Sequence, residues 1–198
     1  MPQRKFRITQ TLLSSWLWAY KLDDGYEEFL KTLRREKNPP TKAMLDGVKF
    51  EGMVNAHLDG APLDMEHKWA MVIGEVADEL KGSQKQVTLF RDITVSGVPF
   101  LLHGVLDFLR AGVIYDTKFS TKYSVGKYLN SPQHPMYFAL VPEAYEFKYI
   151  VSDGKYVYRE RYTPKDIEPI EKTIAQFMGF LERHKLVDLY CENWKTKG

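Results

Sequence analysis

The stretch GVLDFLRAGVIYDTKFS, residues 104–120, constrains the fold more than any other part of the chain. It reads as two apolar strands joined by a short turn, but Asp107 lies in the first strand and Asp116 with Lys118 in the second. Burying an unpaired charge is very unfavourable, so buried charged groups are normally paired with one another or bound to a metal. The remainder of the sequence has to distinguish between these two arrangements.

The periodicity along the chain predicts helices before the central strands, between later strands and at the end. Helices are expected over residues 8–22, 25–37, 41–58 and 63–80, then from Ser131-Pro132 and from Thr163 onward. Strands are expected over residues 85–95, 98–109, 112–120, 145–152 and 155–163, with hairpin turns at Ser96-Gly97 and Asp153-Gly154. This order predicts an α/β (α+β) layer fold around a mixed sheet of about five strands flanked by helices.

The composition is that of one globular domain spanning residues 1–198. Hydrophobic residues make up 44% and charged residues 27% of the 198 positions, which argues against disorder. We divide the domain into a helical part (1–82), a sheet-bearing part (83–162) and a C-terminal helix (163–198). The net charge of +2 excludes neither nucleic acid nor a small molecule as the ligand.

The single cysteine, Cys191, excludes an internal disulfide and a multi-cysteine zinc or iron–sulfur site. A free thiol suits a reducing cytoplasm, which is the location we expect. No apolar stretch approaches the roughly 18 residues of a membrane span, and no signal-peptide core follows the N-terminus, so we expect no membrane association.

The length of the turn decides whether the three charged side chains meet. Asp116 and Lys118 are two residues apart and share one face of their strand. A two-residue loop at Arg110-Ala111 would make Asp107 and Asp116 diagonal neighbours, whereas a four-residue loop from Arg110 to Val113 would place them directly opposite. A three-residue loop without a bulge would send them to opposite faces of the sheet.

Two carboxylates this close repel one another unless a cation lies between them. A hard divalent cation with oxygen ligands, Mg²⁺ or Mn²⁺, suits such a pair. Lys118 could then stabilise negative charge on a phosphate or orient a water molecule. The alternative is that Asp107, Asp116 and Lys118 form a structural cluster, or that Asp-x-Lys is a solvated strand segment.

The helix expected at 41–58 supplies a third acid. Met44, Val48, Val54 and Leu58 form one stripe on this helix, and Glu51 falls in its middle. Gly47, one turn earlier, would allow close approach to the sheet. Other apolar residues on the same helix blur this stripe, so Glu51 is also compatible with a purely structural position.

Four short motifs in sequence order resemble the PD-(D/E)XK nuclease superfamily, in its RecB-like and lambda-exonuclease-like branch. The motifs are GVKFE (47–51), GVLD (104–107), DTK (116–118) and QHPMY (133–137), within a resemblance covering roughly residues 5–160. Leu106 replaces the proline of the family name, and the first motif lacks the histidine that many RecB-like members carry. Members with an iron–sulfur cluster need four cysteines, which this chain does not have.

The resemblance implies a restriction-endonuclease-like core and a role for each matching residue. Glu51, Asp107, Asp116 and the Thr117 carbonyl would bind Mg²⁺ or Mn²⁺. Lys118 would position the attacking water and balance charge in the transition state. Gln133 would order that water or the scissile phosphate, and Tyr137 would contact the DNA backbone.

The segment after the second central strand has the composition of a DNA-binding path. Lys122 and Lys127 alternate with Tyr123 and Tyr128 here. The lysines would neutralise phosphates and the tyrosines could stack on frayed bases. The alternative is a solvated loop whose aromatic rings pack locally.

These residues predict a divalent-metal-dependent DNA nuclease. The resemblance to the RecB-like and lambda-exonuclease-like branch favours an exonuclease over an endonuclease. The resemblance suggests a role in phage or mobile-element recombination or repair, in a bacterial or phage-infected cell, with a single-strand annealing or recombination protein as a partner. The alternatives are a non-catalytic nucleic-acid-binding module of the same fold and a structure-specific endonuclease or resolvase. The oligomeric state stays open.

Overall fold

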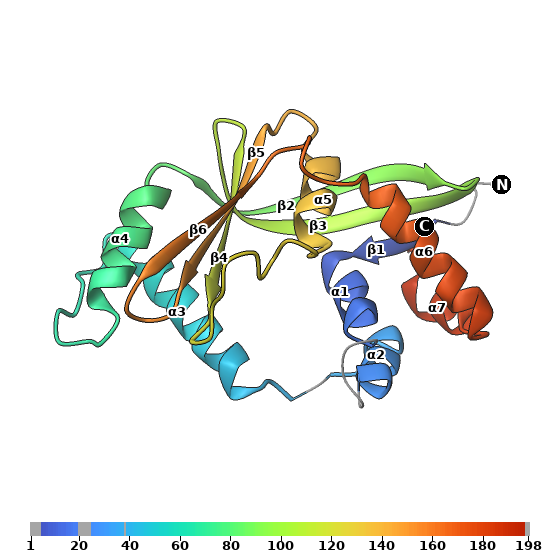
Figure 1. Ribbon diagram of the computed structural model, residues 1–198, viewed down its shortest axis with the longest axis horizontal. Helices are drawn as coiled ribbons and strands as arrows, with labels where there is room; N and C mark the ends of the chain where they lie inside the picture. Colours follow the sequence, from blue (N-terminus) through green and yellow to red (C-terminus); the bar gives the residue numbers. More distant parts are fainter. Residues whose placement is uncertain (1–4, 20–24, 38, 197–198) are drawn as a thin grey trace.

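A computed structural model describes residues 5–19, 25–37 and 39–196 of the chain. In these residues one six-stranded mixed sheet is flanked by seven helices, which confirms the predicted α+β class (Figure 1). The strands are β1 (Phe6–Thr9), β2 (Gln84–Val95), β3 (Val98–Arg110), β4 (Val113–Phe119), β5 (Glu146–Ser152) and β6 (Val157–Tyr162). The helices are α1 (Gln10–Trp18), α2 (Gly25–Leu33), α3 (Lys42–Leu58), α4 (Ala70–Leu80), α5 (Gln133–Leu140), α6 (Ile170–Arg183) and α7 (Val187–Trp194).

The long strand β3 organises the sheet because it pairs with three other strands. β2 runs antiparallel along nearly its whole length. Two strands share the other edge of β3: β1 pairs in parallel with Phe100–His103, and β4 pairs antiparallel with Phe108–Arg110. β5 then lies parallel to β4, and β6 antiparallel to β5. The edge of β3 between β1 and β4 is therefore open over residues 104–107.

Two tight turns fix the register around β3. Ser96 and Gly97, and likewise Ala111 and Gly112, adopt left-handed backbone angles, with φ of 50°, 81°, 48° and 78° respectively. Two successive left-handed residues match the twist of antiparallel strands, which is the geometry of two-residue hairpins. The expected hairpin at Ser96-Gly97 is confirmed.

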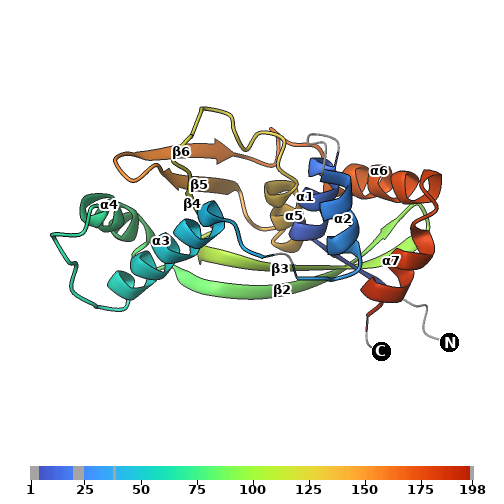
Figure 2. The same ribbon diagram turned by 90° about the horizontal axis from the view of Figure 1, so that it is seen from below.

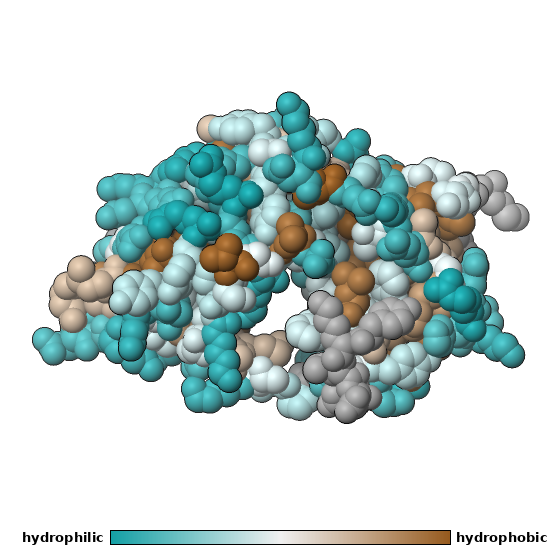
Figure 3. All heavy atoms as spheres, in the orientation of Figure 1, coloured by the Kyte–Doolittle hydropathy of each residue, from teal (hydrophilic) through white to brown (hydrophobic). Residues whose placement is uncertain are grey.

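The helices form two groups at opposite ends of the long β2–β3 hairpin, as two perpendicular views show (Figures 1 and 2). One group consists of α3 and α4; the other contains α1, α2, α6 and α7, with α5 toward the middle. Each group has its own buried apolar cluster against the sheet. On the face shown in Figure 3 the surface is hollowed between α3 and the α1–α2 pair. No helix in the described part of the chain is long and apolar enough to cross a membrane.

Several expected boundaries differ from the observed ones. The helix expected at 8–22 begins only at Gln10, because residues 8 and 9 belong to β1, and positions 20–22 lie outside the described residues. Thr9 caps α1 by accepting a hydrogen bond from the Leu12 amide. The helix expected over 63–80 begins only at Ala70. The helix expected from Thr163 begins at Ile170, because Asp166 closes a turn by accepting from the Thr163 amide and hydroxyl. Helix α3 agrees with the prediction, with Thr41 as its cap.

Candidate active site

The observed β3–β4 register places the two aspartates of the central strands opposite each other. Arg110 pairs with Val113 across the Ala111–Gly112 turn, and Phe108 pairs with Tyr115. If this register continues by one residue, Asp107 lies opposite Asp116. This is the directly opposed arrangement considered from the sequence, and the two residues that form the turn are Ala111 and Gly112. The paired ladder ends at Tyr115, and beyond it the Thr117 amide donates to Asp107 Oδ2 (3.2 Å).

Asp116 is the buried centre of this arrangement, with 1% of its surface exposed. The Lys118 ammonium lies 2.7 Å from its Oδ2 atom. The side-chain amide of Gln133, at the start of α5, donates to its Oδ1 atom. Strand β4 and helix α5 thus bring together three residues that the sequence separates by up to 17 positions.

The charges of this cluster act on one another at close range, and Asp116 is buried whereas Asp107 and Lys118 are half-buried. Burial, and then the neighbouring Asp116 carboxylate, raise the pKa of Asp107 to about 8. Burial alone would lower the pKa of Lys118, but the Asp116 and Asp107 carboxylates raise it above its ordinary value. Lys118 therefore stays protonated, whereas Asp107 favours its neutral form at pH 7 when no further cation is near.

Glu51 approaches the same cluster from α3. Burial and the Asp116 carboxylate raise its pKa above the ordinary value. Its Oε1 atom accepts a hydrogen bond from Gln86 Nε2 (3.1 Å). Gln86 has a left-handed backbone (φ 52°) in β2, where the pairing with β3 skips the position across from Asp107.

The expected stripe on α3 is only partly buried. Phe50 and Val54 are buried, but Met44 and Val48 are 59% and 69% exposed because the first half of α3 extends beyond the sheet. Gly47 makes no close approach to another element, contrary to expectation.

The donor chemistry suits a divalent metal, but the three carboxylates are not assembled as a ligand set. Within residues 5–19, 25–37 and 39–196, no three His, Cys, Asp or Glu side chains form a group that could hold a metal ion as they stand. Asp107 and Asp116 face each other, whereas Glu51 is turned to Gln86. Burial, and then the Asp116 carboxylate, raise the pKa of Asp107, and a cation beside the two carboxylates would favour the ionised form of Asp107.

Tyr137, which the resemblance places on the DNA backbone, is 5% exposed and packs inside the protein. Its hydroxyl donates to the Val105 carbonyl (2.8 Å) on the open edge of β3. A Cβ atom at Gly104 would lie 2.9 Å from the Tyr137 ring and 2.7 Å from Leu140, so glycine is required for α5 to pack this closely. In this conformation Tyr137 closes the gap between β1 and β4.

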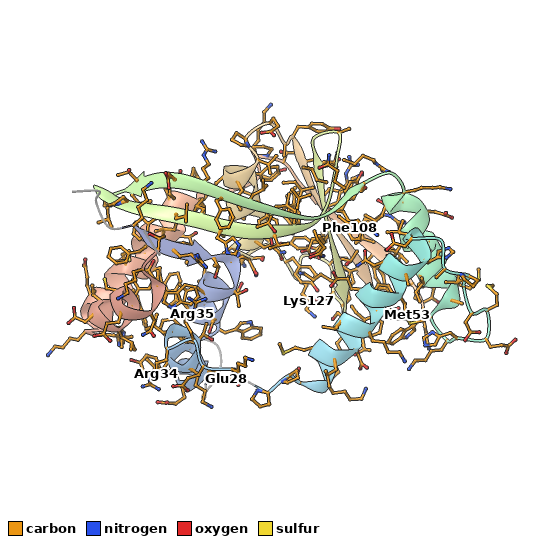
Figure 4. The ribbon with its side chains drawn as sticks, turned by 180° about the vertical axis from the view of Figure 1, so that it is seen from behind. Glu28, Arg34, Arg35, Met53, Phe108 and Lys127 are labelled. Carbon is orange, nitrogen blue, oxygen red and sulfur yellow. The ribbon has the colours of Figure 1, made fainter. Side chains whose placement is uncertain are left out.

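The segment proposed to bind DNA lies in a loop between β4 and α5. Lys122 is exposed. The Lys127 ammonium donates to Ser120 Oγ (2.6 Å), and Figure 4 shows Lys127 between α1 and α3, near the hollow. Tyr123 packs against Tyr158 with ring centroids 4.6 Å apart and donates to Glu160 (2.8 Å). Tyr123 is thus held by local packing, whereas Lys122 and Lys127 are exposed.

Several residues outside this cluster have clear positions in the fold. His103 lies between Thr9 and Phe90 and stacks on the Phe90 ring. Of the four tryptophans, Trp16, Trp69 and Trp194 are buried, whereas Trp18 is 51% exposed. Sequence reasoning missed Gln86, whose contribution depends on an unusual backbone conformation that no local pattern indicates.

Comparisons with known proteins bear on the fold alone. No family model and no curated protein matches the sequence. The crystal structure of SSO0001 resembles the chain with a TM-score of 0.54 and 14% sequence identity, covering 91% of this chain and 79% of that one. The similarity supports the mixed α+β architecture described above.

Proposed function

We propose that the chain is a divalent-metal-dependent nuclease that hydrolyses phosphodiester bonds in DNA. The observation that carries this proposal is the meeting of Asp107, Asp116, Lys118 and Gln133 at the point where β4 separates from β3. Two opposed carboxylates beside a protonated lysine provide both metal ligands and a positive charge for a phosphate. The sequence resemblance to PD-(D/E)XK nucleases points to the same residues.

Each residue has a defined task in this proposal. Asp107 and Asp116 would hold Mg²⁺ or Mn²⁺ together with the Thr117 carbonyl, and Glu51 would join them after turning away from Gln86. When bound, such a metal lowers the pKa of a water molecule and offsets phosphate charge. Lys118 places a fixed positive charge where negative charge develops during hydrolysis. Gln133 orients the Asp116 carboxylate through its amide.

The surroundings suit a strand of nucleic acid that enters from the hollowed face. Lys122 and Lys127 lie on the loop after β4, where they can neutralise phosphates. An exonuclease acting in recombination or repair remains our preferred form of this function, together with a recombination or annealing partner. The family resemblance is the sole basis for these finer assignments.

A non-catalytic nucleic-acid-binding module is the second candidate, and one observation favours it. Gln133 donates to Asp116 Oδ1 and Lys118 forms an ion pair with the Oδ2 atom, and the carboxylates of the described residues do not form a ready metal site. Such a cluster would also serve as a buried structural network.

A digestion assay separates the two candidates. The protein is incubated with end-labelled linear duplex, linear single strand and closed circular DNA, in Mg²⁺, Mn²⁺ or EDTA. Asp116→Asn and Lys118→Met are compared with Glu75→Gln, which removes only an exposed ion pair with Arg159. We expect metal-dependent loss of linear DNA that the two site variants reduce by at least about 100-fold and the control leaves unchanged. Survival of the circle indicates an exonuclease; DNA retention without cleavage in any metal favours the non-catalytic module.

A further inference from the structure

A pocket of about 300 Å³ opens directly beside the acid cluster. Helix α1 forms one wall, and the end of the β4–α5 loop with the start of α5 forms the other. Its lining residues are Gln10, Ser14, Leu17, Trp18, Lys118, Tyr128, Asn130, Ser131, Pro132 and Gln133. We propose that this pocket binds one nucleobase of the substrate, next to the bond that is cleaved, an inference that rests on the proposed nuclease function.

The charge distribution of the pocket favours a neutral occupant. Among the described lining residues Lys118 is the single charged one, and it lies at the side that meets Asp116. A pocket for a phosphate would need several cationic or backbone N–H donors converging on it. A nucleotide whose base enters the pocket would place its phosphate toward Lys118, where the positive charge is.

Trp18 provides the flat apolar surface that a base requires. It is 51% exposed, whereas the other three tryptophans are 4–6% exposed. Exposure of a large aromatic side chain inside a pocket is typical of a stacking platform. On the opposite wall the Tyr128 ring is fixed because it stacks on Tyr149, with ring centroids 4.6 Å apart and planes 23° from parallel.

Two side-chain amides supply hydrogen-bonding groups for the edge of a base. Gln10 donates one N–H to Ser14 Oγ (2.8 Å), and toward the described residues its second N–H and its carbonyl oxygen make no further hydrogen bond. Asn130 is exposed, and its side chain makes no hydrogen bond to the described residues. An amide side chain carries one donor group and one acceptor group, which match the paired donor and acceptor on the edge of a base. Gln10 and Asn130 can therefore form hydrogen bonds with the edge of a base in the pocket.

Tryptophan fluorescence can test this site without any cleavage. The protein is titrated with deoxynucleoside 5′-monophosphates in EDTA, and separately with 2-deoxyribose 5-phosphate, which lacks a base. We expect saturable quenching by the nucleotides, none by the base-free sugar phosphate, and loss of the quenching in Trp18→Phe. Trp69→Phe is the matched control, because Trp69 is buried in the apolar cluster beneath α3 and α4. This variant should keep the quenching by nucleotides.

An abasic substrate then tests the site during turnover. Removing the base that enters the pocket should raise the KM of the wild-type protein roughly 5- to 150-fold, and Trp18→Ala should abolish the difference between the two substrates. Equal quenching by the base-free sugar phosphate, or no quenching, would overturn the nucleobase site. Base-dependent quenching without cleavage in any metal would support the site and reject the nuclease function.

Discussion

At the residue scale, Asp107 links the site to the stability of the protein. Its pKa, raised to about 8 from an ordinary value near 3.8, means that the folded protein holds a proton that the unfolded chain has lost. The stabilising effect of that proton is complete below about pH 4 and disappears as the pH rises through 8. Without metal, each pH unit in this window lowers stability by up to about 1.4 kcal/mol.

We therefore predict that Asp107→Asn removes this pH dependence. In EDTA the melting temperature of the variant minus that of the wild type should increase between pH 5 and pH 8, by up to about 3–6 °C for each pH unit. Added Mg²⁺ should stabilise the wild type at pH 8 and not the variant. If the difference in melting temperature between variant and wild type stays constant from pH 5 to pH 8, Asp107 is ionised throughout this range.

Gly104 gives a second prediction at this scale, because it determines how closely α5 can approach β3. Gly104→Ala should destabilise the protein by about 1–3 kcal/mol, since its Cβ would collide with Tyr137 and Leu140. Chemical denaturation would measure the loss. Gly52→Ala is the control: nothing lies within 4 Å of a Cβ there, and the helix should gain about 0.5–1 kcal/mol. A neutral Gly104→Ala would mean that α5 can shift away from the sheet without cost.

The residues of the site were accessible to sequence reasoning to different degrees. The alternation of β3 and β4 predicted that Asp107, Asp116 and Lys118 could share one face, because strand periodicity is local. The contact between Gln133 and Asp116 depends on how α5 packs on the sheet, which periodicity does not encode. Glu51 was placed on a buried stripe that the structure leaves half exposed.

At the element scale, the Ala111–Gly112 turn sets the register on which the opposition of the two aspartates depends. Ala111 has a φ of 48°, a conformation that costs an L-residue roughly 1–2 kcal/mol and that asparagine tolerates better. Ala111→Asn should therefore stabilise the protein by about 0.5–1 kcal/mol in chemical denaturation, because it creates the Asn-Gly pair preferred in such turns. Ala111→Val should destabilise it, since β-branched residues rarely adopt this conformation. Equal stability of the two variants would indicate that residue 111 does not adopt a left-handed backbone conformation in this turn.

The elements missed from the sequence share a physical cause. β1 has only four residues, and its parallel pairing with β3 joins segments about 94 positions apart in the chain, as in Phe6 with Phe100. Helix α7 is separated from α6 by a break at which Lys185 adopts a φ of 57°, without a glycine or proline to mark it. Long, strongly periodic elements such as α3 were predicted well because their signal repeats over several turns.

At the scale of the whole molecule, the sheet joins two apolar clusters. Phe50, Trp69 and Phe108 belong to the cluster beneath α3 and α4, and Trp16 and Phe177 to the cluster around α1 and α6. Successive residues of β4 and β5 contribute to both: Ile114 to one and Tyr115 to the other, Tyr149 to one and Ile150 to the other. The central strands, which also carry Asp116 and Lys118, cannot lose one cluster without weakening the other.

This arrangement predicts that the two ends of the molecule unfold together. Phe50→Ala and Phe177→Ala, one in each cluster, should each lower the free energy of unfolding by about 3–5 kcal/mol, because both rings are fully buried. Trp69 reports on the first cluster and Trp16 with Trp194 on the second, so variants that keep only one set of tryptophans can follow each cluster during urea denaturation. Both sets should give the same midpoint in each truncation variant. Two separate midpoints would show that α3 and α4 detach while the remainder of the protein stays folded. The site takes Glu51 from α3 and Gln133 from α5, so in that case it would be assembled only when both clusters are intact.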